Sequence, residues 1–178
     1  MSKKIIVITG GPGTGKSSCI QALKQTGYIC FDEVSREVTK KAQEEGIDQL
    51  FLTNPLLFSE LLLEGRTKQY EEALKHESNL IFLDRGIPDV LAYMDFIGDE
   101  YPEHFVNSCK DFTYNQVFIL APWQEIYQSD NERYEDFDQA VEIHHHLIDT
   151  YMLYNYELYD VPFGSVEKRV DYILNTIK

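Results

Sequence analysis

Residues 10–17 read Gly10-Gly11-Pro12-Gly13-Thr14-Gly15-Lys16-Ser17, which is a complete G-x-x-x-x-G-K-[ST] phosphate loop. The segment before it, 3–9, is apolar and β-branched, as is typical of a buried strand. The segment after it, 17–25, carries apolar residues at helical spacing and ends before Gly27. A strand, a glycine-rich loop and a helix in this order predict that the loop wraps around a phosphate.

The chemistry of this loop assigns a role to each of its residues. Glycines let successive backbone N–H groups curl around a phosphate, and the helix N-terminus adds a partial positive charge. Lys16 is expected to reach the β- and γ-phosphates, and the Ser17 hydroxyl to hold Mg²⁺. A chance glycine-rich turn is the alternative, but the flanking segments favour a nucleoside triphosphate site. The expected nucleotide-binding residues are Gly11, Gly13, Thr14, Gly15, Lys16, Ser17 and Ser18.

The composition bounds the class of protein. The chain has 178 residues, 43% of them hydrophobic, which suits one domain, 1–178, with a real core. A formal net charge of −14 argues against nucleic acid or an anionic membrane as the main partner. The three cysteines have no metal-site spacing and no apolar stretch is long enough to span a membrane, so a reduced, cytoplasmic setting is expected. The oligomeric state stays open.

Apolar and helical patterns alternate along the chain, which predicts an α/β fold. The expected architecture is three-layered, with a five-stranded, mostly parallel sheet and helices on both faces. Pro55 after Asn54 marks one clear helix start. The predicted strands are 3–9, 28–31, 79–83, 116–120 and 158–161. The predicted helices are 17–25, 33–45, 55–76, 88–97, 102–111, 137–156 and 165–177.

Acidic residues follow two of these strands. Asp84 ends an apolar strand, where a carboxylate would lie beside the phosphate loop and orient Mg²⁺ or its waters. A simple turn residue is the alternative for Asp84. Asp32 and Glu33 follow another strand, and one of them could accept a proton from a substrate hydroxyl or fix a sugar. The other is expected to cap the next helix, with Glu33 favoured as the functional acid.

Three arginines are further candidates. Arg133 is the only Lys or Arg between Lys110 and Lys168, in a polar segment after the fourth strand. A mobile lid near 123–138 would place it over the transferring phosphoryl group, whose developing charge it would stabilise. A surface ion pair is the alternative. Arg66 and Arg85 are weaker candidates for substrate contact, and Arg85 could equally pair with a carboxylate.

With these residues in place, the chain resembles the predicted-ATPase branch of P-loop proteins filed as an AAA-type domain. That branch includes the kinase domain of the bifunctional NAD-biosynthesis regulator, which phosphorylates ribosylnicotinamide. The resemblance rests on 8–17, 31–37, 82–89 and 161–170 and covers nearly the whole chain in order. It implies a nucleotide-kinase-like P-loop NTPase fold, and it makes Pro162 and Phe163 candidates for lining an adenine pocket.

The leading functional hypothesis is a small-molecule kinase. ATP would be the donor, and the acceptor a nucleoside-like or other hydroxyl-bearing molecule whose identity the sequence leaves open. Adenine is favoured over guanine because no N-K-x-D motif occurs in the chain. The alternatives are a nucleotide-dependent regulatory switch and a stand-alone ATPase without an acceptor.

Overall fold

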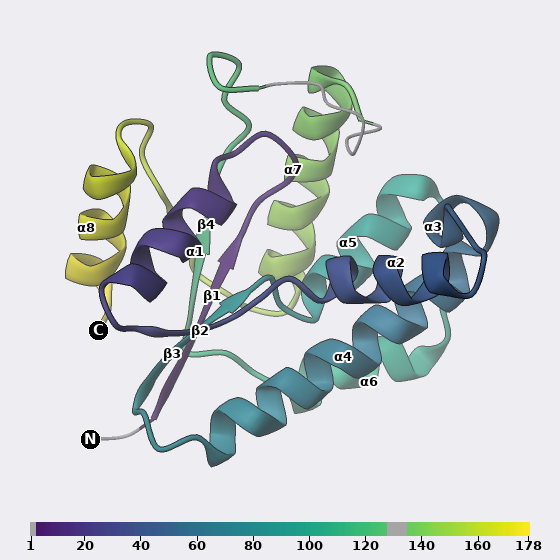
Figure 1. Ribbon diagram of the computed structural model, residues 1–178, viewed down its shortest axis with the longest axis horizontal. Helices are drawn as coiled ribbons and strands as arrows, with labels where there is room; N and C mark the ends of the chain where they lie inside the picture. Colours follow the sequence, from purple (N-terminus) through teal and green to yellow (C-terminus); the bar gives the residue numbers. More distant parts are fainter. Residues whose placement is uncertain (1–2, 128–134) are drawn as a thin grey trace.

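A computed structural model describes residues 3–127 and 135–178, and its centre is a five-stranded parallel sheet. The strand order is β2-β3-β1-β4-β5, and each neighbouring pair is parallel (Figure 1). The sequence predicts a mostly parallel sheet, and the structure confirms the fold class. The strands are β1 (Lys4–Thr9), β2 (Ile29–Phe31), β3 (Leu80–Asp84), β4 (Gln116–Ile119) and β5 (Leu158–Asp160).

The helices follow the predicted ranges closely, with one addition. The short helix α3 has no counterpart in the prediction, because a single turn is too brief to produce a periodic pattern. Helix α7 ends earlier than predicted, since Asn155 has a positive φ of 65° and turns the chain toward β5. The helices are α1 (Lys16–Gln25), α2 (Val34–Glu44), α3 (Leu50–Thr53), α4 (Pro55–Lys75), α5 (Pro88–Ile97), α6 (Glu103–Asp111), α7 (Phe137–Leu153) and α8 (Val166–Thr176).

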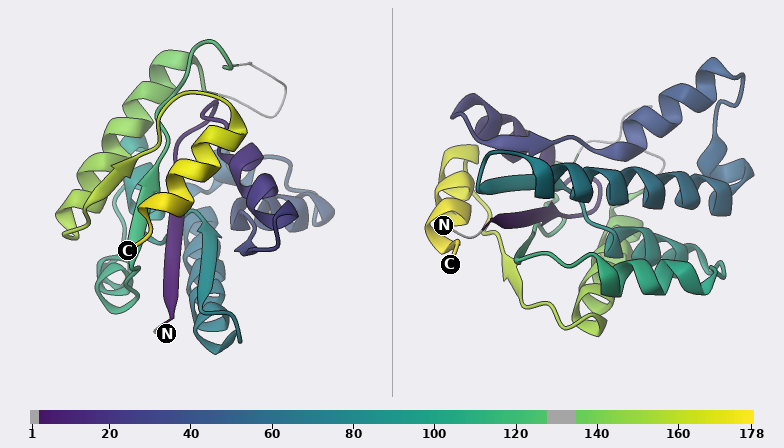
Figure 2. Two further views of the ribbon diagram at one scale, coloured as in Figure 1. Left: turned by 90° about the vertical axis from the view of Figure 1, so that its left-hand side faces the viewer. Right: turned by 90° about the horizontal axis from the view of Figure 1, so that it is seen from below.

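Strand β1 is buried on both faces and separates two apolar cores. Successive side chains of a strand point to opposite faces. Ile5 and Val7 therefore pack in the core with α4, α5 and α7, whereas Ile6 and Ile8 pack with α1 and α8. Figures 1 and 2 show α1 and α8 together on one side of the sheet and the other helices beyond its opposite face.

A third apolar cluster joins α2, α4, α5 and α6 outside the sheet. Gly65 on α4 lets α2 approach closely, since a Cβ there would lie 2.4 Å from Cγ1 of Val34. This contact fixes the start of α2 and so the residue that precedes it, Glu33. Within the described residues, no helix combines the length and the apolar character needed to cross a bilayer.

The parallel arrangement brings five loops to one edge of the sheet. All strands run the same way, so the segments after their carboxyl ends lie near one another. The phosphate loop follows β1, Asp32 and Glu33 follow β2, and Arg85 follows β3. The segments after β4 and β5 reach the same edge. The candidate site is built there.

Candidate functional site

The phosphate loop adopts a backbone that only glycine accommodates at two positions. Gly13 and Gly15 have positive φ angles of 71° and 76°. A Cβ at Gly13 would overlap the ring of Tyr127, and one at Gly15 would lie 2.5 Å from Nη1 of Arg169. Gly15 is the N-cap of α1 and supplies no side-chain hydrogen bond to the helix. The first N–H groups of α1 are thus left for a ligand, as at other phosphate-binding helix N-termini.

Lys16 lies against the end of β3. Its Nζ donates a hydrogen bond to Oδ1 of Asp84 and lies 3.8 Å from Oε2 of Glu33. Asp84 reaches this position because β1 and β3 pair in a register that sets Ile8 opposite Asp84. Lys16 and Asp84 are both buried. The loop lysine therefore contacts Asp84, the last residue of β3, and lies near Glu33, which comes shortly after β2.

Glu33 is the centre of a buried charge cluster. Nη2 of Arg66 donates to its Oε1 at 3.0 Å, and Nε of Arg85 donates to its Oε2. Burial alone would raise the pKa of Glu33, but Arg85, Arg66 and Lys16 lower it to about 2. Arg85 has a positive φ of 74°, an uncommon backbone state for a residue with a side chain. Glu33 is thus a permanently ionised acid at neutral pH.

Asp89 on α5 holds the surroundings of Arg85. Its carboxylate accepts hydrogen bonds from the Thr9 hydroxyl at 2.5 Å and the Gly86 N–H at 3.0 Å. It also accepts from the Tyr151 hydroxyl on α7 at 2.5 Å and from Nη1 of Arg85 at 3.3 Å. Burial and the adjacent carboxylate raise the pKa of Tyr151, which stays a donor. The end of β1, the β3–α5 turn and α7 therefore meet at one carboxylate.

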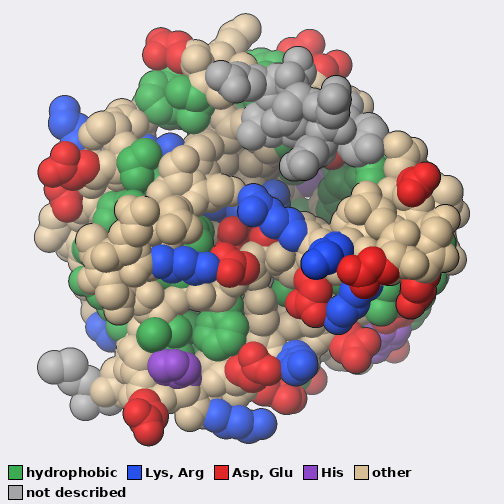
Figure 3. Space-filling model, viewed as in Figure 1, with side chains coloured by type: hydrophobic (Ala, Val, Ile, Leu, Met, Phe, Trp, Pro, Cys, Tyr) green, Lys and Arg blue, Asp and Glu red, His purple; other side chains and the backbone are tan. Residues whose placement is uncertain are grey.

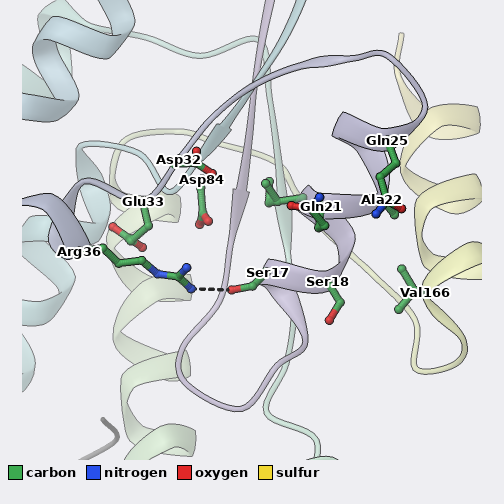
Figure 4. Close-up of a pocket in the computed structure, with 11 residues that line it drawn as sticks. Ser17, Ser18, Gln21, Ala22, Gln25, Asp32, Glu33, Arg36, Asp84 and Val166 are labelled. Atoms are coloured by element: carbon green, nitrogen blue, oxygen red, sulfur yellow. Dashed lines mark hydrogen bonds between the residues drawn. The ribbon is translucent and has the colours of Figure 1, made fainter.

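A cavity of about 470 Å³ opens beside this cluster. Figure 4 shows Arg36 reaching from α2 toward α1, where its Nη2 donates to Oγ of Ser17 at 3.2 Å. Lys and Arg side chains alternate with Asp and Glu side chains across the middle of the face in Figure 3. The volume of the cavity lies within the usual range for a small-molecule site. Its lining includes Ser17, Ser18, Asp32, Glu33, Arg36 and Asp84.

An aromatic pair lies near the phosphate loop, beside Arg169. Trp123, after β4, stacks on Phe163, after β5, with ring centroids 5.1 Å apart and an interplanar angle of 25°. The Phe163 side chain remains exposed. The guanidinium carbon of Arg169 on α8 lies 6.0 Å from the centre of the Trp123 ring. The exposed ring of Phe163, stacked on the half-buried ring of Trp123, suits stacking with a planar ligand group.

Arg169 itself lies beneath the phosphate loop. The residue is 2% exposed, and its Nη2 donates to the carbonyl oxygen of Thr14 at 2.7 Å. Its Nε has no hydrogen-bond partner. Across the described ranges, 3–127 and 135–178, no Asp or Glu forms a salt bridge with it. The loop therefore rests on a buried cation.

The residues that could hold a metal fit Mg²⁺. Ser17 offers a hydroxyl oxygen and Asp84 a carboxylate oxygen, and Mg²⁺ prefers oxygen ligands. The described part of the chain contains no cluster of three or more His, Cys, Asp or Glu side chains that could form a metal cage. Mg²⁺ typically binds through one or two protein groups, with nucleotide phosphates and water completing its shell. Ser17 and Asp84 match that pattern.

The structure brings most of the predicted site residues together and separates one. Lys16, Glu33, Arg66 and Arg85 form one cluster with Asp84. Asp32 lines the cavity but points outward, with a side chain 75% exposed and paired with Lys24 at 2.6 Å. Glu33 lies in the cluster and also caps α2, accepting from the N–H of Ser35 at 3.4 Å. The prediction that one acid acts at the site and the other caps the next helix is therefore wrong, because one residue occupies both positions.

Two further predictions concern an adenine pocket after β5 and a lid that carries Arg133. Pro162 and Phe163 follow β5, and Phe163 stacks on Trp123; that they line an adenine pocket stays a prediction. Arg133, and with it the middle of the lid predicted near 123–138, lies outside the described residues.

Sequence reasoning passed over three residues that the structure places at the site. Asp89 and Arg36 lay inside recognised motifs without being assigned a role. Arg169 likewise lies within 161–170, a segment that carries the resemblance, and its position carries a signal. It shares a helical face with Val166, Val170 and Ile173, so a charged residue occupies an apolar position of α8.

Comparisons with known proteins agree with this geometry. A family model described as "AAA domain" matches residues 5–169. A nucleotide-binding protein of Acinetobacter baumannii is 29% identical over 131 residues, covering 68% of this chain and 46% of that protein. One of Acinetobacter baylyi is 28% identical over 96 residues, covering 51% and 34%. The chain thus spans about half the length, or less, of these curated relatives.

Solved structures with the same fold include several kinases. Deoxyadenosine kinase from M. mycoides superposes with a TM-score of 0.67 at 18% identity, covering 96% of this chain and 97% of that one. Thymidylate kinase from Candida albicans superposes with a TM-score of 0.71 at 17% identity, covering 98% of this chain and 90% of that one. The NadR protein in complex with NR superposes with a TM-score of 0.73 at 13% identity, covering 97% of this chain and 49% of that one. At these identities the likeness establishes a kinase-like P-loop fold.

Proposed function

The chain belongs to the AAA domain family, and we propose that it is an ATP-dependent phosphotransferase acting on a small, nucleoside-like acceptor. It would move the terminal phosphoryl group of ATP to a hydroxyl of that acceptor. One observation carries the proposal: Lys16 meets Asp84 and Glu33 beside the phosphate loop, and these two acids line a cavity of small-molecule size. An ionised carboxylate held by arginines at this place can orient an acceptor hydroxyl toward the γ-phosphate.

The donor half of the site would hold ATP along the phosphate loop. The amides of the loop and of the first turn of α1 would bind phosphate oxygens. Lys16 would turn from Asp84 toward the β- and γ-phosphates, whose negative charge exceeds that of one carboxylate. Ser17 and Asp84 would hold Mg²⁺, which neutralises charge on the phosphates when bound. The Trp123–Phe163 pair, with Pro162, would receive the adenine ring.

The acceptor half would be organised by Glu33. Because its pKa is about 2, Glu33 would be a weak base and would mainly orient the acceptor hydroxyl as a hydrogen-bond acceptor. The bond between the acceptor oxygen and the γ-phosphorus would form as the bond to the ADP oxygen breaks. The hydroxyl proton would pass to Glu33 late in this step and then to water. Arg66 and Arg85 would keep the carboxylate in place.

A lid carrying Arg133 is part of the same proposal. An arginine closing over the site would stabilise charge on the transferring group and exclude water. Its segment follows Tyr127, whose ring already lies over Gly13 of the phosphate loop.

An acceptor screen tests the proposal. ADP release from MgATP should rise at least tenfold with one member of a panel of nucleosides, deoxynucleosides, nucleoside monophosphates and ribosylnicotinamide. Glu33→Gln should lower this acceptor-dependent rate by about 100-fold, within the range for loss of a group that handles a proton. Glu37→Gln is the matched control, because Glu37 is exposed one turn along α2 and pairs with Lys41.

The alternatives would give different results in the same assay. ADP release that no acceptor changes, with equal rates for wild type and Glu33→Gln, would contradict the kinase and indicate a stand-alone ATPase. Tight ATP binding without turnover would contradict it in favour of a regulatory switch.

A further inference from the structure

Arg169 is a buried cation in a place where the described structure supplies no negative charge to balance it. It is 2% exposed, its Nε has no hydrogen-bond partner, and no carboxylate of the described ranges pairs with it. Arg66 is also buried and its Nε also has no hydrogen-bond partner among the described residues, but the other buried cations of the site each have a carboxylate partner. Lys16 contacts Asp84, and Arg66 pairs with Glu33.

Such an arrangement is unfavourable for the protein alone. A guanidinium stays protonated in proteins, so its charge cannot be removed by burial. A charge taken out of water needs an opposite charge or a full set of hydrogen bonds to offset the lost hydration. In the described part of the chain, Arg169 donates a hydrogen bond to the Thr14 carbonyl, and its guanidinium lies over the face of Trp123. Neither neighbour carries a net charge.

The position of Arg169 indicates which anion would balance it. Its Nη2 donates to the Thr14 carbonyl, and a Cβ built on Gly15 would lie 2.5 Å from its Nη1, so the guanidinium packs against the turn that presents backbone N–H groups to a phosphate. Its guanidinium also lies near Trp123, one of the two stacked rings at this edge. Arg169 thus lies between the expected phosphate and base positions. A polyphosphate is the anion that the loop is built to bind.

We propose that Arg169 is a positioning residue for the nucleotide, whose buried charge is balanced by the polyphosphate of the bound ligand. It fixes the Thr14–Gly15 turn and adds a second positive charge behind the loop, beside that of Lys16. The inference rests on the proposed binding of ATP but not on the acceptor. Its consequence is a trade-off: Arg169 destabilises the nucleotide-free protein and strengthens nucleotide binding. A purely structural arginine would stabilise the protein in both states.

The variant Arg169→Met tests this trade-off, since methionine keeps an unbranched chain on the apolar face of α8 and removes the charge. The nucleotide-free midpoint of thermal unfolding should rise by about 2–5 °C, because an unbalanced buried charge is removed. Calorimetric titration should show ATP and ADP binding weakened at least tenfold, with adenosine binding changed less than threefold. Arg169→Lys, which keeps a charge, should recover part of the loss for ATP and ADP. Lys168→Met, at the neighbouring position of α8, is the control and should change none of these values.

Other outcomes separate this inference from the proposed function. A lower nucleotide-free midpoint, with ATP and adenosine weakened equally, would show a structural role and overturn the inference. Unchanged ATP affinity in Arg169→Met, with normal binding by wild type, would also overturn it and leave the phosphotransferase standing. Failure of the wild-type protein to bind ATP would contradict the proposed function itself.

Discussion

At the residue scale, the two acids after β2 show how strongly position alters a carboxylate. Asp32 extends into solvent and pairs with Lys24, whereas Glu33 turns inward among Arg66, Arg85 and Lys16. The sequence presents both as acids at a sheet edge. It favours Glu33, but the three cations around it come from α1, α4 and the β3–α5 turn, far apart in the chain. Local pattern carries no information on such convergence.

The lowered pKa of Glu33 predicts how stability depends on pH. An unfolded glutamate titrates near pH 4.3, and the folded pKa is about 2. The contribution of ionised Glu33 to the free energy of unfolding is therefore present above about pH 4.3 and is lost as the pH falls toward 2. Removing one partner of a buried pair typically costs about 3–5 kcal/mol, so Glu33→Gln should be destabilised at pH 7.

Urea unfolding of wild type and Glu33→Gln at a series of pH values checks this prediction. The difference between the two should be largest above pH 5 and should shrink between about pH 4.3 and pH 2. Glu37→Gln, changed at an exposed position, should follow the wild-type profile. A constant difference between wild type and Glu33→Gln across the whole series would contradict the assigned ionisation.

At the element scale, Asp89 ties together segments that the sequence shows as separate. The strand and helix ranges are predictable because apolar runs of strand length alternate with helical patterns bounded by Gly, Pro and Asn. The packing of α7 against α5 cannot be predicted in the same way, because both helices have apolar faces that could pack against several partners. The Tyr151 hydroxyl bonding to Asp89 fixes that choice.

Tyr151→Phe is expected to weaken this junction. It deletes a hydrogen bond to a buried carboxylate while keeping the ring, so the free energy of unfolding should fall by about 1.5–3 kcal/mol. Chemical denaturation at pH 7 measures the change. Tyr159→Phe is the matched control, since its hydroxyl bonds to Glu157 at an exposed position and its loss should have a much smaller effect. Equal effects of the two changes would contradict the role assigned to Asp89.

At the scale of the whole molecule, the net charge and the charge of the site have opposite signs. The chain carries a formal charge of −14, yet five cations gather at one sheet edge. Focused local charge can attract an anion to a protein of the same overall sign. The sequence predicts this edge correctly, because parallel strands place their following loops together. It does not predict Arg169, which arrives from the last helix. The five cations are Lys16, Arg36, Arg66, Arg85 and Arg169.

The central claim is that this edge binds a nucleoside triphosphate through Lys16, and calorimetric titration with MgATP tests it most directly. Wild type should bind one ATP per chain, and Lys16→Met should bind at least 100-fold more weakly, as expected when a charge contact to phosphate is lost. Lys24→Met, changed in the last turn of α1, should bind ATP with an affinity within threefold of wild type. No binding by wild type, or equal binding by wild type and Lys16→Met, would contradict the account.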